Sequence, residues 1–188
     1  MKSGNRVTAR IAVDGLFTAL ALITFMIESL FPSIPFAPGA KMGLANAFSM
    51  AALILYGPLD AAAVVVCRCL LGAVFTNFSA VLYSLSGGLA SLALSILFLY
   101  VIYPKVSVMA TSIAAAVTHN IVQLFVFAAV ASSTDIFAYL PYFALLGVIA
   151  GAIVGGVVML IFRQVPLSVY ERALGIKTRK STAEIAEE

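Results

Sequence analysis

The sequence predicts an all-α polytopic membrane protein, a bundle of six transmembrane helices. Of its 188 residues, 63% are hydrophobic and only 10% are charged, whereas about a quarter of the residues of a soluble domain are charged. The hydrophobic residues form successive runs, and the longer runs have the roughly 20 residues needed to cross about 30 Å of hydrocarbon. Proline, glycine and polar residues separate the runs, as is typical of the connections in a helical bundle.

We expect one transmembrane domain over residues 1–163 and a basic, partly disordered cytoplasmic tail over residues 164–188. The first hydrophobic run is longer than that of a signal peptide, and no small-residue cleavage site follows it, so it should remain as a helix. The second and third helices are short, which is consistent with tilted or re-entrant ends. The expected helices cover residues 8–30, 41–56, 61–75, 79–103, 106–132 and 138–162.

Glycine and proline mark the points where helices should end or approach each other. Segment 31–40 is rich in proline, so it should connect two helices and fold back onto the bundle. Residues 57–60 (GPLD) should form a tight turn. The pair Gly87 and Gly88 predicts a local break or a close contact in the fourth helix. Three glycines recur every four residues and predict close packing of the sixth helix: Gly147, Gly151 and Gly155.

Basic residues gather on one side of this predicted topology. The N-terminal segment, Lys105 and the tail after residue 163 fall on that side, whereas Lys41 falls on the other. The positive-inside rule therefore predicts that both termini are cytoplasmic. Because orientation accounts for the basic charge, that charge does not indicate nucleic-acid binding.

The residues that metal, redox or nucleotide chemistry needs are not grouped in the sequence. Cys67 and Cys69 lie deep in an apolar run and should be small packing residues. There is a single histidine and no His/Cys cluster, so we expect no metal and no cofactor. A glycine-rich P-loop with its Lys-Ser/Thr is absent from the sequence, so we do not expect this chain to hydrolyse ATP by that route.

The fifth helix carries the most polar stretch of the membrane region. His119, Asn120 and Gln123 lie at spacings of three and four, which places them on one helix face. Polar groups at membrane depth usually face a bundle interior or a cavity, so we expect a binding face. The alternatives are a hydrogen-bonded core histidine, or a proton relay, which no second histidine supports.

Arg68 is the strongest single indication of a site. A charge in mid-helix and mid-bilayer costs a few kcal/mol on insertion scales. It could form a structural ion pair with Glu28 or cap the carbonyls of a broken helix. Alternatively, it could be the counter-charge for an anionic ligand, because its fork matches carboxylate and phosphate. Lys41 and Asn46 begin the second helix, where anions are favoured, although Lys41 could simply anchor that helix at the interface.

Two further groups of residues complete the predicted surfaces. Tyr83, Ser84 and Ser86 either line the same pocket or pack against a neighbouring helix. Together with the charged and amide side chains, they predict a pocket in the outer half of the bundle for a small amphipathic or anionic molecule. A stripe of small residues on the first helix could pack within the bundle or dock a partner subunit: Ala12, Gly15 and Ala19.

Four motifs in this sequence resemble the Gx transporter family, which is labelled heptaprenyl diphosphate synthase component I. They are residues 41–46 (KMGLAN), 68–72 (RCLLG, followed by Phe75), 82–89 (LYSLSGGL) and 116–123 (AVTHNIVQ). That family in turn resembles the substrate-binding S components of energy-coupling-factor (ECF) transporters. The resemblance implies a six-helix bundle in the cytoplasmic membrane of a bacterium or archaeon. It also implies that the bundle captures a vitamin-like molecule, or an isoprenoid- or quinone-related precursor, from outside.

The same resemblance implies partners. S components work with a transmembrane coupling subunit and two ATPase subunits, and dock through an A-x-x-x-A pattern on the first helix. The nearest match here is Gly15 and Ala19. The family label suggests a second hypothesis, a membrane subunit that assists a polyprenyl diphosphate synthase. Such synthases resemble one another in two Asp-rich motifs, whereas Asp14, Asp60 and Asp135 are far apart here, so we expect no catalysis by this chain alone.

Overall fold

A computed structural model of the chain describes residues 3–30, 43–75, 78–103 and 105–163, and every regular element in these ranges is helical. The long helices are α1 (Ser3–Leu30), α2 (Asn46–Tyr56), α3 (Pro58–Phe75), α4 (Phe78–Leu97), α5 (Val108–Ala131) and α6 (Leu140–Arg163). A π-helical turn, η1 (Phe98–Ile102), extends α4, and a 3₁₀ helix, η2 (Asp135–Tyr139), precedes α6. Lys41, segment 31–40 and the tail 164–188 lie outside the described residues.

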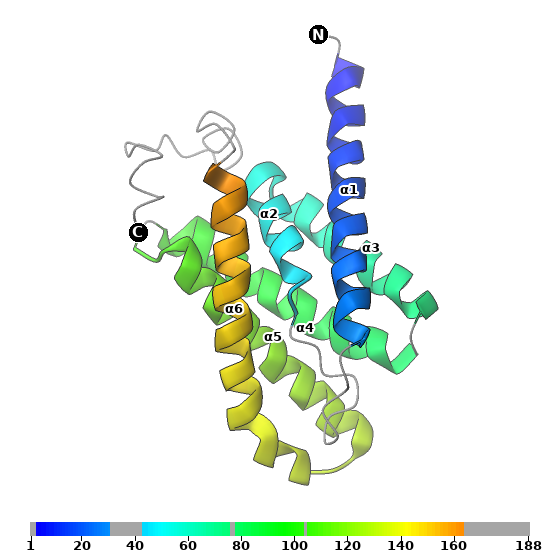
Figure 1. Ribbon diagram of the computed structural model, residues 1–188, viewed down its shortest axis with the longest axis vertical. Helices are drawn as coiled ribbons and strands as arrows, with labels where there is room; N and C mark the ends of the chain where they lie inside the picture. The colour runs from blue at the N-terminus through cyan, green and yellow to red at the C-terminus, as the bar shows by residue number, and fades with distance from the viewer. Residues whose placement is uncertain (1–2, 31–42, 76–77, 104, 164–188) are drawn as a thin grey trace.

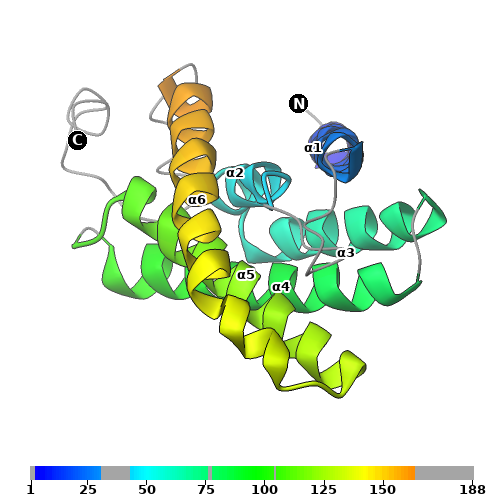
Figure 2. The ribbon, with the colours of Figure 1, turned by 60° about the horizontal axis from the view of Figure 1, so that its bottom comes forward.

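The helices pack in two layers. α1, α2 and α6 lie over α3, α4 and α5 (Figure 2), and contacts between α1 and α3, α2 and α3, and α5 and α6 join the layers. The start of α1 and the end of α6 lie at the same end of the bundle (Figure 1). α2 occupies the centre, where it contacts α1, α3, α4 and α6. Protein therefore surrounds this short helix on several sides.

The all-α membrane bundle that the sequence predicts is confirmed. Five helices of the described chain are long and apolar enough to cross a membrane, and α2 is the shorter sixth. With 11 residues, α2 is about 16 Å long, roughly half the thickness of the hydrocarbon layer. α2 is therefore the short second helix that the sequence predicts, whereas α3, with 18 residues, is long enough to be a candidate span.

The first helix begins at Ser3 and not at residue 8. Two further predicted helix boundaries were wrong, and glycine explains both. The second helix was expected from residue 41, but a turn at Gly43, with φ of 79°, precedes α2. The turn expected over residues 57–60 is reduced to Gly57, whose φ is 107°. Pro58 is already the first residue of α3, a position where proline is favoured because its missing N–H is not needed.

The predicted close packing at the glycines of α6 is confirmed. A Cβ added to Gly151 would lie 2.5 Å from the Cα of Ile113, and one added to Gly147 would lie 2.7 Å from the Cα of Val117. Any side chain at these positions would collide with the α5 backbone. Glycine therefore sets the short separation between α5 and α6.

The small-residue stripe of α1 faces away from the rest of the bundle. Ala12, Gly15 and Ala19 are exposed, and a Cβ added to Gly15 would meet no described atom within 4 Å. The buried side of α1 is instead formed by larger residues such as Phe17 and Phe25. Packing of the stripe within the protein's own bundle, one of the two interpretations offered by the sequence, is therefore wrong for the described chain.

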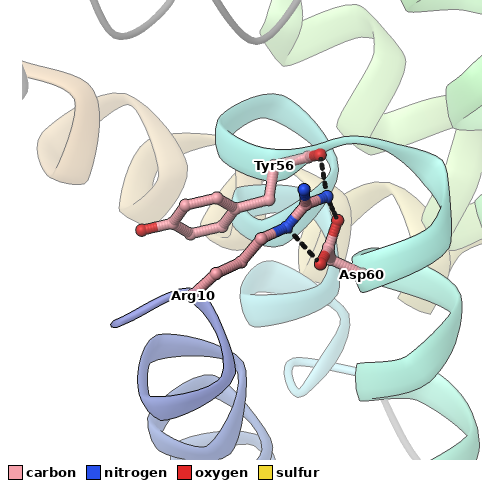
Figure 3. A network of polar contacts seen from close by, with 3 residues as sticks. All are labelled: Arg10, Tyr56 and Asp60. Atoms are coloured by element: carbon pink, nitrogen blue, oxygen red, sulfur yellow. Dashed lines mark hydrogen bonds and ion pairs between the residues drawn. The ribbon is translucent and has the colours of Figure 1, made fainter. Parts of the chain in front are cut away.

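A polar contact joins the first part of α1 to the connection between α2 and α3 (Figure 3). Arg10 forms an ion pair with Asp60, in which Nε donates to Oδ1 at 2.7 Å, and its Nη2 donates to the Tyr56 carbonyl oxygen at 2.9 Å. The guanidinium also lies 5.9 Å from the centre of the Tyr56 ring. This contact fixes one end of α1 against the bundle.

Candidate functional site: a buried polar cluster around α2

Arg68 lies within α3 among apolar residues and is 1% exposed. Its Nη2 donates a hydrogen bond of 2.6 Å to Oδ1 of Asn46. No carboxylate of the described residues forms an ion pair with it, although Glu28 is near enough to act on its charge electrostatically. The guanidinium is therefore a buried cation held by an amide, and the predicted ion pair with Glu28 is not formed.

The turn that starts α2 places Asn46 in the site. The backbone N–H of Asn46 donates to the Gly43 carbonyl oxygen at 2.9 Å, and the backbone N–H of Leu44 donates to Oε1 of Glu28 at 2.7 Å. Glu28 comes from the end of α1 and is 9% exposed. It therefore acts as a support for the turn.

His119 lies between two glycines. A Cβ added to Gly43 would be 3.2 Å from Cδ2 of the ring, and one added to Gly87 would be 3.0 Å from Nδ1. The ring is 2% exposed. Because Gly87 on α4 and Gly43 in the turn before α2 have no side chains, the ring of His119 fits between them. Gly87 therefore allows close contact between α4 and His119.

Gly88 plays the same part for Arg68. A Cβ there would be 2.9 Å from Cγ1 of Val65 and 3.3 Å from Nη2 of Arg68. α4 continues as a regular helix through both glycines. Of the two alternatives for Gly87 and Gly88, the close contact is confirmed and the local break is wrong.

Asn120 and Gln123 extend the polar cluster along α5. Asn120 is 1% exposed and its Nδ2 donates to the Phe143 carbonyl of α6 at 3.1 Å. Gln123 is 3% exposed and lies one helical turn beyond His119. The predicted polar face of α5 therefore points into the protein and not toward lipid.

Several polar atoms of this cluster are buried without a hydrogen-bond partner among the described residues. Burying a polar group in this state costs about 1–3 kcal/mol, and such groups are uncommon in folded proteins. A bound polar molecule would supply the missing partners. The atoms are Nδ2 of Asn46, Oγ of Ser49, Nε of Arg68, Nδ1 of His119, Oδ1 of Asn120 and Oε1 of Gln123.

A small cavity borders the cluster. Its free volume is about 20 Å³, which is room for about one water molecule. Its hydroxyl groups mostly bond nearby atoms: Ser91 donates to Gly88 O at 2.9 Å and Ser112 contacts Sδ of Met50 at 3.0 Å. Its walls come from α2, α4, α5 and α6, and include Asn46, Ser49, Ser91, Ser95, Ser112 and Val154.

The structure divides the predicted site residues into two groups. Asn46, Arg68 and His119 come together, with Asn120 and Gln123 adjoining them on α5. Tyr83, Ser84 and Ser86 have other contacts. The Tyr83 ring packs edge-on against Phe127 at 5.6 Å, Ser84 contacts Sγ of Cys69 at 3.5 Å, and Ser86 donates to the Leu82 carbonyl of its own helix at 2.7 Å. These three residues pack α4, and within the described residues their hydrogen bonds and ring contacts go to atoms outside the cluster.

Two site residues were missed from the sequence. Ser49 follows Asn46 by three residues on α2, a spacing that could have placed both on one face. Gly43 carries a positive φ and lies against His119, and its position in the polar KMGLAN stretch was the available signal. Within the described residues, no three His, Cys, Asp or Glu side chains gather as a metal site.

The fold and the cluster define a polytopic α-helical membrane protein with a buried, cationic, largely amide-lined site. A family model described as heptaprenyl diphosphate synthase component I matches residues 17–161. The chain belongs to this family, which confirms its resemblance to the Gx transporter family. The family name describes a component associated with a partner enzyme, heptaprenyl diphosphate synthase. Among curated proteins, no significant match was found.

Proposed function

We propose that this chain is the substrate-binding subunit of an ECF-type importer. It captures a small vitamin-like molecule, or an isoprenoid- or quinone-related precursor, from outside the cell, and both of its termini are cytoplasmic. The observation that carries this proposal is the group of buried, unpartnered polar atoms around Arg68 and His119. A membrane anchor has no use for such groups, because each lowers stability unless something binds it.

The size of the cavity beside Asn46 bears on how a molecule could be captured. A site for a vitamin-sized molecule needs about 300–1,000 Å³, far more than the cavity of about 20 Å³ beside Asn46. Within the described residues, binding of such a molecule beside Asn46 would therefore require the helices around α2 to separate. Substrate binding would then be coupled to a change in the bundle, which a partner subunit can detect.

The proposed partners are a transmembrane coupling subunit and two ATPase subunits. The exposed stripe formed by Ala12, Gly15 and Ala19 supports docking, because small residues allow a second helix to approach closely in lipid. The chain itself is proposed to catalyse no reaction. If the purified chain alone transported a substrate into liposomes, these partners would not be required and this part of the proposal would be wrong.

The second candidate function is a membrane subunit that assists a polyprenyl diphosphate synthase. The family name favours it. It predicts that the enzyme co-purifies with this chain and that prenyl synthesis falls when the chain is removed. It does not account for the buried cation at Arg68.

Native mass spectrometry of the gently purified protein separates the two functions. For the importer subunit, we expect a bound small molecule in the wild type and a much lower occupancy in Arg68→Ala. Ser86→Ala is the matched control, since Ser86 bonds its own helix, and it should retain the molecule. An empty wild-type protein that carries a prenyl synthase subunit would instead establish the second function.

A further inference from the structure

The hydrogen-bond donors and acceptors of the buried cluster are not mixed at random. From their arrangement we infer that the site binds a small organic anion, with its acidic group at Arg68 and Asn46 and an N–H or O–H donor directed at Asn120. This inference rests on the proposed substrate-binding function and names the chemical class of the substrate.

The donor side is fixed by the bond between Arg68 and Asn46. Because Oδ1 of Asn46 accepts from Arg68, its remaining unpartnered atom, Nδ2, can only donate. The unpartnered Nε of Arg68 is likewise a donor, since the guanidinium keeps its proton in proteins. Two buried donors that lack partners among the described residues therefore lie at the same corner.

The acceptor side is fixed by α6. Nδ2 of Asn120 donates to the Phe143 carbonyl, so the other atom of this amide, the unpartnered Oδ1, can only accept. Asn120 follows His119 along α5, and the His119 ring lies beside Asn46 across Gly43. This acceptor comes from α5, whereas the two donors come from α2 and α3, so a ligand that reaches both needs different groups at its two ends.

Charge decides what the donor corner takes. A buried cation is costly unless it is paired. Among the described residues Arg68 donates its hydrogen bond to a neutral amide, while Glu28 acts on its charge without forming an ion pair with it. A carboxylate or phosphate would neutralise the guanidinium and accept from Nε and from Nδ2 of Asn46 together. A cationic ligand would be repelled by the charge of Arg68, and a neutral hydrocarbon would leave both donors without a hydrogen-bond acceptor.

The test uses the full-length protein in detergent micelles and a defined mixture of small aromatic and aliphatic compounds. Each carboxylic acid in the mixture is matched by its carboxamide and by its amine on the same carbon skeleton, and half of the acids carry an additional N–H or O–H group. After washing, the retained compounds are released and identified by mass spectrometry, together with any molecule that co-purified.

We expect acids to be retained over their amides and amines, and donor-bearing acids to be retained best. Loss of a charge-assisted hydrogen bond should lower the retention of acids in Arg68→Gln by at least about tenfold, whereas Arg68→Lys should keep part of the preference for acids. Ser86→Ala should behave as the wild type. If Arg68→Gln does not fold, the preference of the wild type for acids over amides decides the matter by itself.

Retention of neutral or cationic compounds, or equal retention of acids by Arg68→Gln, would overturn the inference while leaving substrate binding in place. If only the co-purified molecule is found, its acidic group, or the lack of one, decides in the same way. A protein that holds no compound from any source would count against the proposed function itself.

Discussion

The guanidinium of Arg68 and the side-chain carbonyl of Asn46 are 2.6 Å apart and join the interior of α3 to the first residue of α2. This hydrogen bond links α2 to α3 through Asn46 and Arg68, two polar residues with mostly apolar neighbours. It gives the buried cation a partner and turns the remaining Asn46 nitrogen toward the site. The same pair therefore contributes to the packing of the bundle and to the proposed binding site.

A double-mutant cycle should show that these two residues are coupled. Arg68→Met and Asn46→Leu should each lower the free energy of unfolding by about 1–3 kcal/mol, because each leaves a buried partner unsatisfied. The double variant, in which both polar groups are replaced, should be destabilised by less than the sum. The measurement is unfolding in mixed detergent micelles. Strict additivity would mean that the two residues are not energetically coupled.

Gly87→Ala should destabilise the bundle by about 1–3 kcal/mol, because overpacking forces backbone shifts. The added Cβ would lie 2.9 Å from the His119 carbonyl oxygen, so α4 and α5 would have to separate. Gly156→Ala is the matched control on α6, where a Cβ meets no described atom within 4 Å. It should be neutral or stabilising by up to about 1 kcal/mol, since alanine favours a helix. Equal thermal midpoints for both variants would contradict this prediction.

Gly15→Leu should leave the isolated protein as stable as the wild type or more stable by up to about 1 kcal/mol, because this position is exposed and open and leucine favours a helix more than glycine does. It should, however, reduce co-purification with a partner subunit that docks on the stripe. The measurements are thermal unfolding of the chain alone and pull-down from membranes. A stable chain that still captures its partner fully would show that docking occurs on another face.

Asp60→Asn should have a small effect. The ion pair that Asp60 forms with Arg10 has an exposed guanidinium, and exposed pairs are worth about 0–1 kcal/mol. Arg10→Ala should cost more than Asp60→Asn, because it also removes the hydrogen bond to the Tyr56 carbonyl. Unfolding at low and high salt tests both statements, since added salt should narrow the difference between the wild type and Asp60→Asn. A loss of several kcal/mol in Asp60→Asn would contradict them.

The helices could be predicted from the sequence because hydrophobic runs are long and membrane helices need length above all. The start of α2 could not, because KMGLAN is compatible with a helix until the positive φ of Gly43 is known. Likewise, Gly87 reads as a helix breaker from propensity alone, whereas in the structure its missing side chain admits His119. The position of a neighbouring helix cannot be derived from the local sequence, so a close contact of this kind cannot be predicted from it.

The polar residues of the site could be named because polar groups at membrane depth stand out against an apolar background. Their pairing could not be derived, since Arg68 is as compatible with a carboxylate as with the amide of Asn46. The orientation of α1 was also undetermined, because lipid and protein interior are equally apolar and both faces of that helix suit either. Only the packing of Phe17 and Phe25 shows which face turns inward.

α1 is attached to the rest of the protein near both of its ends. Arg10 is bound to Asp60 at one end, and Glu28 holds the Leu44 amide at the other, about 27 Å along the helix axis. The Glu28 contact reaches the same turn that carries Asn46. The helix with the exposed stripe of Ala12, Gly15 and Ala19 is therefore joined by a hydrogen bond to the segment that places Asn46 in the buried cluster.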